Sequence, residues 1–285
     1  MAELRIGTCS WKFPSWKGLV YSQARGINYL AEYAEKYDTV EIDQWFWSLF
    51  GVETVSLPKP FTAAEYAASV PEDFAFTVKV PNSITLTHFY NRDKKQPLEP
   101  NPHFLSQELF ASFLQTLEPL MPRIAVLMFQ FEYLNKKKMA SQAQFLSRLE
   151  PFFDAVPRRC VYALEPRNPQ YLDAAYFRFL NENDLRHVFL QGYYMPDCTG
   201  IYQRHRELVQ GLTVIRLHGY DRPGMEEKTG KKWDLVAASK DAELERAVQM
   251  IQDLLGRGVH VYVNVNNHYE GSAPLTIQKL NRLLA

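Results

Sequence analysis

The chain has 285 residues, 46% of them hydrophobic, and its 32 Lys and Arg residues balance 32 Asp and Glu residues. This composition supports a sizeable core and argues against disorder, and the zero net charge does not favour a general nucleic-acid or membrane binder. The three cysteines form no CxxC pair and cannot complete a disulfide framework, which indicates a reducing compartment. Because no apolar run approaches a membrane span and the N-terminus leaves no room for a signal peptide before the first strand, we expect a cytoplasmic protein.

Eight short apolar runs have the length and alternation of strands. They are Leu4–Cys9, Thr39–Asp43, Phe74–Val80, Ile124–Glu132, Val161–Glu165, His187–Gln191, Val214–His218 and Val259–Asn267. Helical periodicity follows most of them, over Tyr29–Tyr37, Leu105–Leu117, Ser141–Phe153, Tyr171–Glu182, Asp241–Leu255 and Leu275–Leu284. The repeated strand–helix pattern predicts the α/β class and a single TIM-like (β/α)8 barrel domain over residues 1–285.

The predicted connections differ in length at the two ends of the barrel. Links from helix to strand are short, whereas links from strand to helix are long, with the extremes at Ser10–Asn28, Gln44–Asp73, Pro81–His103 and Gly192–Thr213. The last of these shows no clear helix, and Gln44–Asp73 could hold a small helix around Ala63–Ser69. Long strand-to-helix loops are typical of a TIM-like barrel enzyme, because those loops build its active site.

All five tryptophans lie in strand-to-helix segments, at Trp11, Trp16, Trp45, Trp47 and Trp233. They could form a hydrophobic plug over the barrel mouth. They could also provide a surface on which a base or a sugar ring stacks, and Trp11 is a candidate for such a contact.

Side chains on a strand alternate between its two faces, so each predicted strand has an apolar and a polar side. Glu41 and Asp43 share one face of the second strand, and Arg216 and His218 share one face of the seventh. These residues fall at the carboxyl ends of the strands, where a barrel enzyme carries its active site.

Glu41 and Glu165 are the leading candidates for acid–base catalysis. They could serve as general acid and general base if their surroundings separate their pKa values. The alternative is an internal salt bridge with Arg216, because an uncompensated buried charge costs roughly 3–5 kcal/mol. We therefore expect Arg216 to bind at least one of the two glutamates.

His218 could move protons near neutral pH, bind a metal, or have only a structural role. Lys79 could hold an anion or act as a base with a lowered pKa, or simply be a solvated strand end. No HExxH motif or Cys–His cluster is present, so we predict no cofactor and disfavour a multinuclear zinc site, while a single divalent metal ion stays open. Cys9 is interpreted as a small buried residue, because the sequence identifies no base that would make it a nucleophile.

Three amide side chains close the last predicted strand, at Asn264, Asn266 and Asn267. An amide both donates and accepts hydrogen bonds without carrying charge. This property suits the binding of a polar ligand or a hydrogen-bond network in the barrel interior. Packing alone does not explain three amides in four positions, so this segment is the strongest single indication of a site.

Several segments together resemble the YecE-like family, a group of unknown function with a TIM-barrel fold. The resemblance rests on Ile6–Trp11, Thr39–Ile42, Phe76–Lys79, Phe129–Phe131, Glu165–Arg167, Ile215–Gly219, Val261–Asn267 and Glu270–Pro274, which cover nearly the whole chain in family order. The chain departs from the family at Cys9-Ser10, where Ser-Gly is usual, and at Pro166, where Phe is usual. The resemblance implies the barrel and the positions of the site, but it supplies no reaction.

The favoured function is an enzyme, of the hydrolase type because that class is common, acting on a polar anionic substrate that resembles a nucleotide or a sugar phosphate. Arg216 or Lys79 would hold the negative charge, and Glu41 or Glu165 would move a proton with His218 as partner. Further substrate contacts are assigned to Trp11, Gln130, Arg167, Asn264, Asn266 and Asn267.

The alternative is a non-catalytic protein that binds a nucleotide or nucleic acid. It would use the aromatic loops and the basic runs Lys136–Lys138 and Arg204–Arg206, and its binding would weaken as salt rises. A solvated charged turn is the structural interpretation of the lysine run. No membrane partner is expected, and the sequence does not indicate an oligomeric state.

Overall fold

Eight parallel strands close into a barrel in the computed structural model, which describes residues 2–51, 54–90 and 97–285. The strands are β1 (Leu4–Cys9), β2 (Thr39–Ile42), β5 (Ala75–Lys79), β6 (Ile124–Gln130), β7 (Val161–Glu165), β8 (Arg186–Gly192), β9 (Leu212–Gly219) and β10 (His260–Val265). Their hydrogen-bonded order around the barrel is β1-β10-β9-β8-β7-β6-β5-β2. The predicted barrel and all eight predicted strands are therefore confirmed, with bounds that shift by a few residues.

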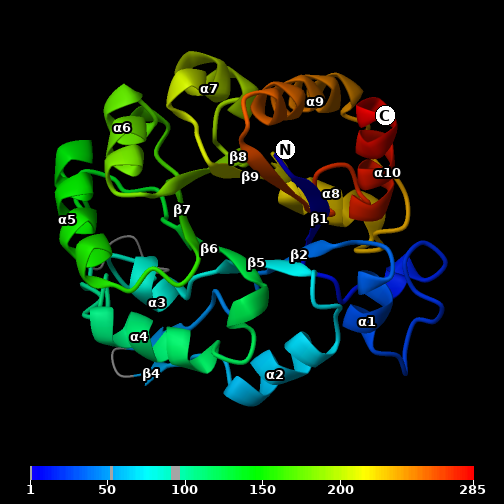
Figure 1. Cartoon of the computed structure of the whole chain (residues 1–285), viewed down its shortest axis with the longest axis horizontal. Coiled ribbons are helices and arrows are strands. Elements are labelled where there is room, and N and C mark those ends of the chain that lie inside the picture. The colour runs from blue at the N-terminus through cyan, green and yellow to red at the C-terminus, as the bar shows by residue number, and fades with distance from the viewer. Residues whose placement is uncertain (1, 52–53, 91–96) are drawn as a thin grey trace.

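The α-helices mostly form an outer ring around these strands (Figure 1). They are α1 (Tyr29–Ala34), α2 (Pro60–Ala68), α3 (Asn82–Thr85), α4 (Gln107–Thr116), α5 (Gln142–Ala155), α6 (Ala174–Glu182), α7 (Cys198–His205), α8 (Arg222–Thr229), α9 (Asp241–Gly256) and α10 (Ala273–Leu284). In Figure 1, α8 is drawn inside this ring, beside β1. Each predicted helix is present, and the small helix expected around Ala63–Ser69 begins earlier, at Pro60. Helix α6 begins later than predicted because the Asp173 carboxylate caps it by accepting a hydrogen bond from the backbone N–H of Tyr176.

The sequence-based description of Gly192–Thr213 as a segment without a helix was wrong, because α7 lies within it. Asp197 caps this helix by accepting a hydrogen bond from the backbone N–H of Thr199, and Ile201 is buried on its inner side. Only a short helix forms, and Gly200 in its middle has low helix propensity, so the apolar periodicity was too weak to reveal it.

A two-stranded antiparallel sheet of β3 (Leu49–Gly51) and β4 (Thr54–Val55) was also not predicted. These strands are too short to show an alternating pattern. Residues 91–96 of the predicted loop Pro81–His103 lie outside the described residues.

The core has two parts that follow from strand alternation. The larger apolar cluster lies between the strands and the helices. A smaller cluster belongs to the opposite face of the strands and consists of Ala75, Val126, Met128, Ala163, Val188, Val214 and Tyr262. Along the same strand faces, toward the carboxyl ends, the side chains become polar, and this change positions the candidate site.

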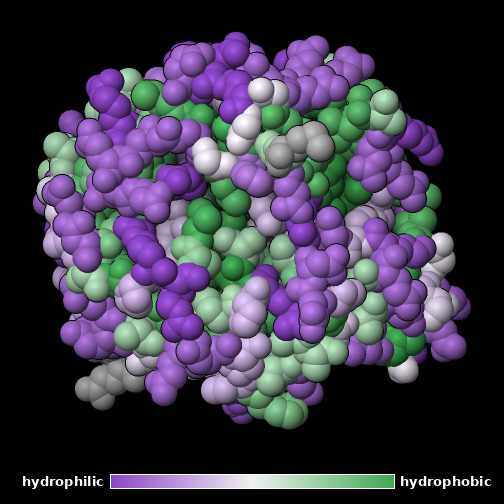
Figure 2. Space-filling view, viewed as in Figure 1, coloured by the Kyte–Doolittle hydropathy of each residue, from purple (hydrophilic) through white to green (hydrophobic). Residues whose placement is uncertain are grey.

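The outside of the molecule is mixed in character. In the view of Figure 2, hydrophilic side chains cover most of the face, with hydrophobic ones interspersed among them. Among the described residues, no helix combines the length and the apolar character that a bilayer span requires.

Candidate active site

Arg216 on β9 is the central charged group of the barrel interior. It is 1% exposed, and its guanidinium donates from Nε and Nη2 to the two carboxylate oxygens of Glu41, at 2.8 and 2.6 Å. Its Nη1 donates to Oε2 of Glu165 at 2.5 Å. The expectation that Arg216 binds at least one glutamate is confirmed, and it binds both.

The two glutamates lie beneath the cavity rather than on its surface. Glu41 is 0% and Glu165 is 1% exposed, and neither lines the cavity described below. Burial alone would raise the pKa of Glu165, but the neighbouring charges of Arg167, Arg216 and Lys79 lower it to about 2. Glu165 is therefore ionised at neutral pH, and the geometry suits it to hold Arg216 rather than to exchange protons with a substrate.

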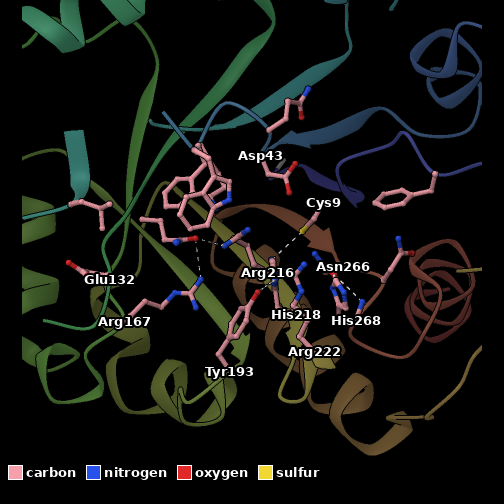
Figure 3. A pocket seen from close by; sticks show the side chains of 18 of the residues that line it. Cys9, Asp43, Glu132, Arg167, Tyr193, Arg216, His218, Arg222, Asn266 and His268 are labelled. Atoms are coloured by element: carbon pink, nitrogen blue, oxygen red, sulfur yellow. Dashed lines mark hydrogen bonds between the residues drawn. The ribbon is translucent and has the colours of Figure 1, made fainter. Parts of the chain in front are cut away.

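A cavity of about 450 Å³ opens at the carboxyl ends of the strands. Figure 3 shows Arg216 and His218 in the middle of it, with Cys9 and Asp43 on one side and Tyr193 on the other. Of the residues that the sequence assigned to catalysis or to substrate contact, seven line the cavity: Lys79, Gln130, Arg167, Arg216, His218, Asn266 and Asn267. Strand alternation thus brings most of the predicted site together.

Lys79 ends β5 and is 8% exposed, so it is not a solvated strand end. Its ammonium lies 3.7 Å from the ring centroid of Phe46, a cation–π contact. Burial and the nearby charge of Arg216 lower the pKa of Lys79 to about 8, against the opposing effects of Glu41, Glu165 and Asp43.

His218 connects the two sides of the cavity. Its Nδ1 lies 3.2 Å from the Tyr193 hydroxyl, and its Nε2 lies 3.4 Å from Sγ of Cys9. Burial, with the positive charges of Arg216, Arg167 and Lys79, holds the pKa of His218 well below its usual range. The imidazole is therefore neutral at neutral pH, with one ring nitrogen as donor and the other as acceptor.

The backbone around Gly192 places Tyr193 over the cavity. Gly192 has φ 141°, and a Cβ there would lie 2.3 Å from the carbonyl oxygen of Gly219. Tyr193 itself is left-handed, with φ 55°, and its N–H donates to the same oxygen at 2.9 Å. Its ring then stacks with Arg167, whose guanidinium carbon lies 4.6 Å from the ring centroid. Arg167 in turn is paired with Glu165 at 2.6 Å.

Cys9, Glu41 and His218 are the described residues whose ligand atoms cluster closely enough to hold a metal, all within 4.8 Å of one another. Two features oppose a metal at this position. Arg216 already occupies both oxygens of Glu41, and a second cation beside it would be repelled. Burial, and next the charge of Glu41, raise the pKa of the Cys9 thiol well above its usual value, so the thiolate ligand is disfavoured. The same shift agrees with Cys9 as a buried residue rather than a nucleophile.

The three amides at the end of β10 have separate surroundings. Asn264 is buried below the cavity and donates to Glu41 at 3.2 Å and to Thr77 at 2.9 Å. Asn266 lines the cavity and lies against His268. Asn267 accepts from the first N–H of α10, at Ala273, and from the Trp16 indole. Two of the three amides thus organise the structure, and Asn266 is the one most available to a ligand.

The tryptophans divide between packing and the cavity. Trp11 does not line the cavity; it is buried, and its ring contacts Tyr66 edge-on at a centroid distance of 5.0 Å. Trp16 is also buried, as expected of a plug over the barrel. Trp233 and Trp47 line the cavity, and Trp47 is 60% exposed. The stacking surface stays a prediction, and Trp47 is the tryptophan best placed for it.

Sequence reasoning did not assign Arg222 and His268 to the site. It noted Asp43 only as the companion of Glu41 on one strand face, and it counted Phe46 and Tyr193 only among the aromatic residues of the loops, although all five residues line the cavity. Asp43, Phe46, Tyr193 and His268 follow the carboxyl end of a strand or lie in the loop after it, and Arg222 begins α8, the helix that follows β9. Position after a strand was therefore the available signal, but the folding of the loops decides which of these residues reach the cavity.

The basic runs proposed for nucleic-acid binding are partly engaged within the protein. Lys138 pairs with Glu132 at 2.7 Å, and Arg206 pairs with Asp253 at 3.0 Å. The His205 ring stacks on Phe177 at a centroid distance of 4.9 Å. Lys136 and Lys137 are exposed, in agreement with a solvated turn.

Comparison with known proteins agrees with this architecture. The family model described as "Protein of unknown function DUF72" matches residues 5–285. The UPF0759 protein YecE of Escherichia coli (strain K12) is 26% identical over 170 residues, which cover 58% of this chain and 49% of that protein. The chain thus matches about half the length of this curated relative.

Two solved structures of DUF72 family proteins share the fold. The protein from Thermotoga maritima MSB8 is 20% identical and superposes with a TM-score of 0.69 over 99% of each chain. The protein from Enterococcus faecalis V583 is also 20% identical, with a TM-score of 0.67 over 99% of this chain and 95% of that one. The resemblance to the YecE-like group is confirmed, and the chain belongs to the DUF72 family.

Proposed function

We propose that the cavity is the active site of an enzyme that acts on a small anionic substrate of the nucleotide or sugar-phosphate type, by hydrolysis. The observation that carries this proposal is the charge arrangement at the cavity. Lys79, Arg167 and Arg216 line it, while the carboxylates that balance them, Glu41 and Glu165, are buried beneath it. Two carboxylates, Asp43 and Glu132, also line the cavity, but the cationic lining residues outnumber them: they are Lys79, Arg167, Arg216 and Arg222. The excess of positive charge on the cavity wall favours an anionic ligand.

In this proposal the two glutamates position the anion site. Their three hydrogen bonds to Arg216 fix the plane of its guanidinium before the substrate arrives. Arg167, held between Glu165 and the Tyr193 ring, supplies the more exposed guanidinium. A preorganised pair of guanidiniums suits the oxygens of a phosphate group.

His218 is the residue to which we assign proton transfer. It lines the cavity, and its neutral imidazole has one unprotonated ring nitrogen that can accept a proton from a water molecule that attacks the substrate. A bound anionic group would offset the positive charges that lower the pKa of His218 and so strengthen it as a base. The Tyr193 hydroxyl at Nδ1 fixes the orientation of the ring. This assignment moves the acid–base role from Glu41 and Glu165 to His218.

The test is phosphate release from a panel of nucleoside monophosphates, sugar phosphates and p-nitrophenyl phosphate. For an accepted substrate, His218→Gln should lower kcat by about 10²- to 10⁴-fold, the usual contribution of general acid–base catalysis. The matched control is His260→Gln, at the exposed amino end of β10, which should leave kcat unchanged. Binding of these compounds without turnover of any of them would instead support the non-catalytic alternative.

A further inference from the structure

We propose that Lys79 is a carbonyl-reactive amine that forms an imine with the aldehyde or ketone group of a small anionic substrate. The inference rests on the proposed function in one respect, namely that the anionic group of the substrate is held in the same cavity. It adds a covalent step and a substrate class, an open-chain sugar phosphate or a related oxo compound.

The surroundings of Lys79 are those of a reactive amine rather than of an ion-pair partner. Among residues 2–51, 54–90 and 97–285, no carboxylate lies within ion-pair distance of its Nζ, and no acceptor takes a hydrogen bond from it. Its contact is the aromatic face of Phe46 at 3.7 Å. A buried lysine without an ionic partner is unusual, because lysine is rarely buried unless it is paired.

The electrostatic environment keeps part of this amine neutral. Burial and the positive charge of Arg216 outweigh Glu41, Glu165 and Asp43, which act in the opposite direction, and the pKa of Lys79 falls to about 8. At pH 7.5 about a quarter of the molecules would carry the neutral amine, compared with about one in a thousand for an ordinary lysine. The neutral amine is the nucleophile in imine formation, and desolvation of this kind is a known way to activate it.

The cavity also holds the other groups that the reaction needs. The lone pair of Nζ attacks the carbonyl carbon, a C–N bond forms, and the carbonyl oxygen becomes a hydroxyl after proton transfer. Loss of this hydroxyl as water leaves the imine, so one amine and one carbonyl give one imine and one water. His218, which lines the same cavity, can take a proton from the attacking nitrogen and pass it to the leaving hydroxyl, while Arg167 and Arg216 hold the anionic group.

The experiment is reductive trapping on the native protein. Glycolaldehyde phosphate is added with sodium cyanoborohydride, and the modified lysines are mapped and timed by mass spectrometry. We expect Lys79 to be modified at least tenfold faster than the exposed Lys136 and Lys137, which serve as internal controls in the same sample. If Lys79 is modified no faster than Lys136 and Lys137, the inference is overturned. This experiment uses only the native protein, so it does not depend on the folding of a variant.

Two variants separate this inference from the anion site. With Lys79→Met, the fast adduct should be lost, leaving only the slow surface modification. With Arg167→Met, trapping of glycolaldehyde phosphate should slow at least tenfold, while trapping of uncharged glycolaldehyde should keep its rate. If Lys79 is trapped as fast in Arg167→Met as in the native protein, the result would support a reactive amine at Lys79 and count against the anion site. Phosphate binding that needs Arg167, without trapping at Lys79, would support the anion site and overturn the amine.

Discussion

Replacement of Glu41 by glutamine tests how Arg216 is held, because it removes one negative charge from the centre of the barrel and keeps the side-chain shape. Both oxygens of Glu41 accept from Arg216, at 2.8 and 2.6 Å. In Glu41→Gln, an NH₂ group would replace one of these acceptor oxygens. That NH₂ group is itself a donor, and it would face a donor of the Arg216 guanidinium. Removing one partner of a buried ion pair costs roughly 3–5 kcal/mol. We expect about 3 kcal/mol, because Glu165 still pairs with Arg216 in the variant.

Urea unfolding at pH 7.5, followed by circular dichroism, measures this change in the free energy of unfolding. The matched control is Glu245→Gln on the exposed face of α9, which should alter stability by less than about 0.5 kcal/mol. A double-mutant cycle with Arg216→Met then tests the pairing directly. The double variant should be less destabilised than the sum of the single variants by at least about 1 kcal/mol. Equal effects of Glu41→Gln and Glu245→Gln, or an additive cycle, would refute the reasoning.

Three further predictions concern the lysine, the histidines and the strained turn. Because the folded-state pKa of Lys79 is about 8, below the usual 10.5, the protonated lysine destabilises the folded state at pH 7, and Lys79→Met should raise the free energy of unfolding by roughly 1–3 kcal/mol. A loss of stability in urea unfolding would contradict this. The pKa of buried His187 is lowered to about 3 and that of His218 is also lowered, so the unfolded chain binds protons that the folded chain does not. Stability should therefore fall as pH drops below about 6.5, by up to about 1.4 kcal/mol per pH unit for each histidine. His218→Gln and His187→Gln should each flatten this dependence between pH 6 and 5, and an unchanged slope would be evidence against it. Gly192→Ala should cost at least about 2 kcal/mol, because the added Cβ meets the Gly219 carbonyl oxygen at a strained φ, and a thermal melt like that of the native protein would show the turn to be adaptable.

The barrel could be predicted from sequence because each strand carries its own signal. Apolar runs such as Val161–Glu165 have clear ends, and helical periodicity separates them. Period-two alternation also placed Arg216 and His218 on one face, and the parallel register then brings Asn264 beside Arg216 on neighbouring strands. The sharing of a strand face is a local property, and the neighbourhood of Asn264 and Arg216 follows from strand pairing alone. Both can therefore be predicted from the sequence.

The depth of each polar side chain in the barrel could not be predicted in the same way. Glu165 ends its strand like a catalytic residue, yet Arg216 and Arg167 hold it below the cavity. The position of a side chain along the barrel axis depends on how all eight strands are staggered against one another. The sequence of a single strand does not contain this information. Tyr193 reaches His218 only because the chain turns back at Gly192, and such a turn depends on contacts between distant segments.

Isothermal titration of the native protein with inorganic phosphate tests the central claim, that the cavity is an anion site, most directly. The account predicts saturable binding of one phosphate per chain, at least tenfold weaker in Arg167→Met and unchanged in Lys137→Met, a variant of an exposed lysine. Absence of saturable binding, or binding that Arg167→Met leaves intact, would contradict it.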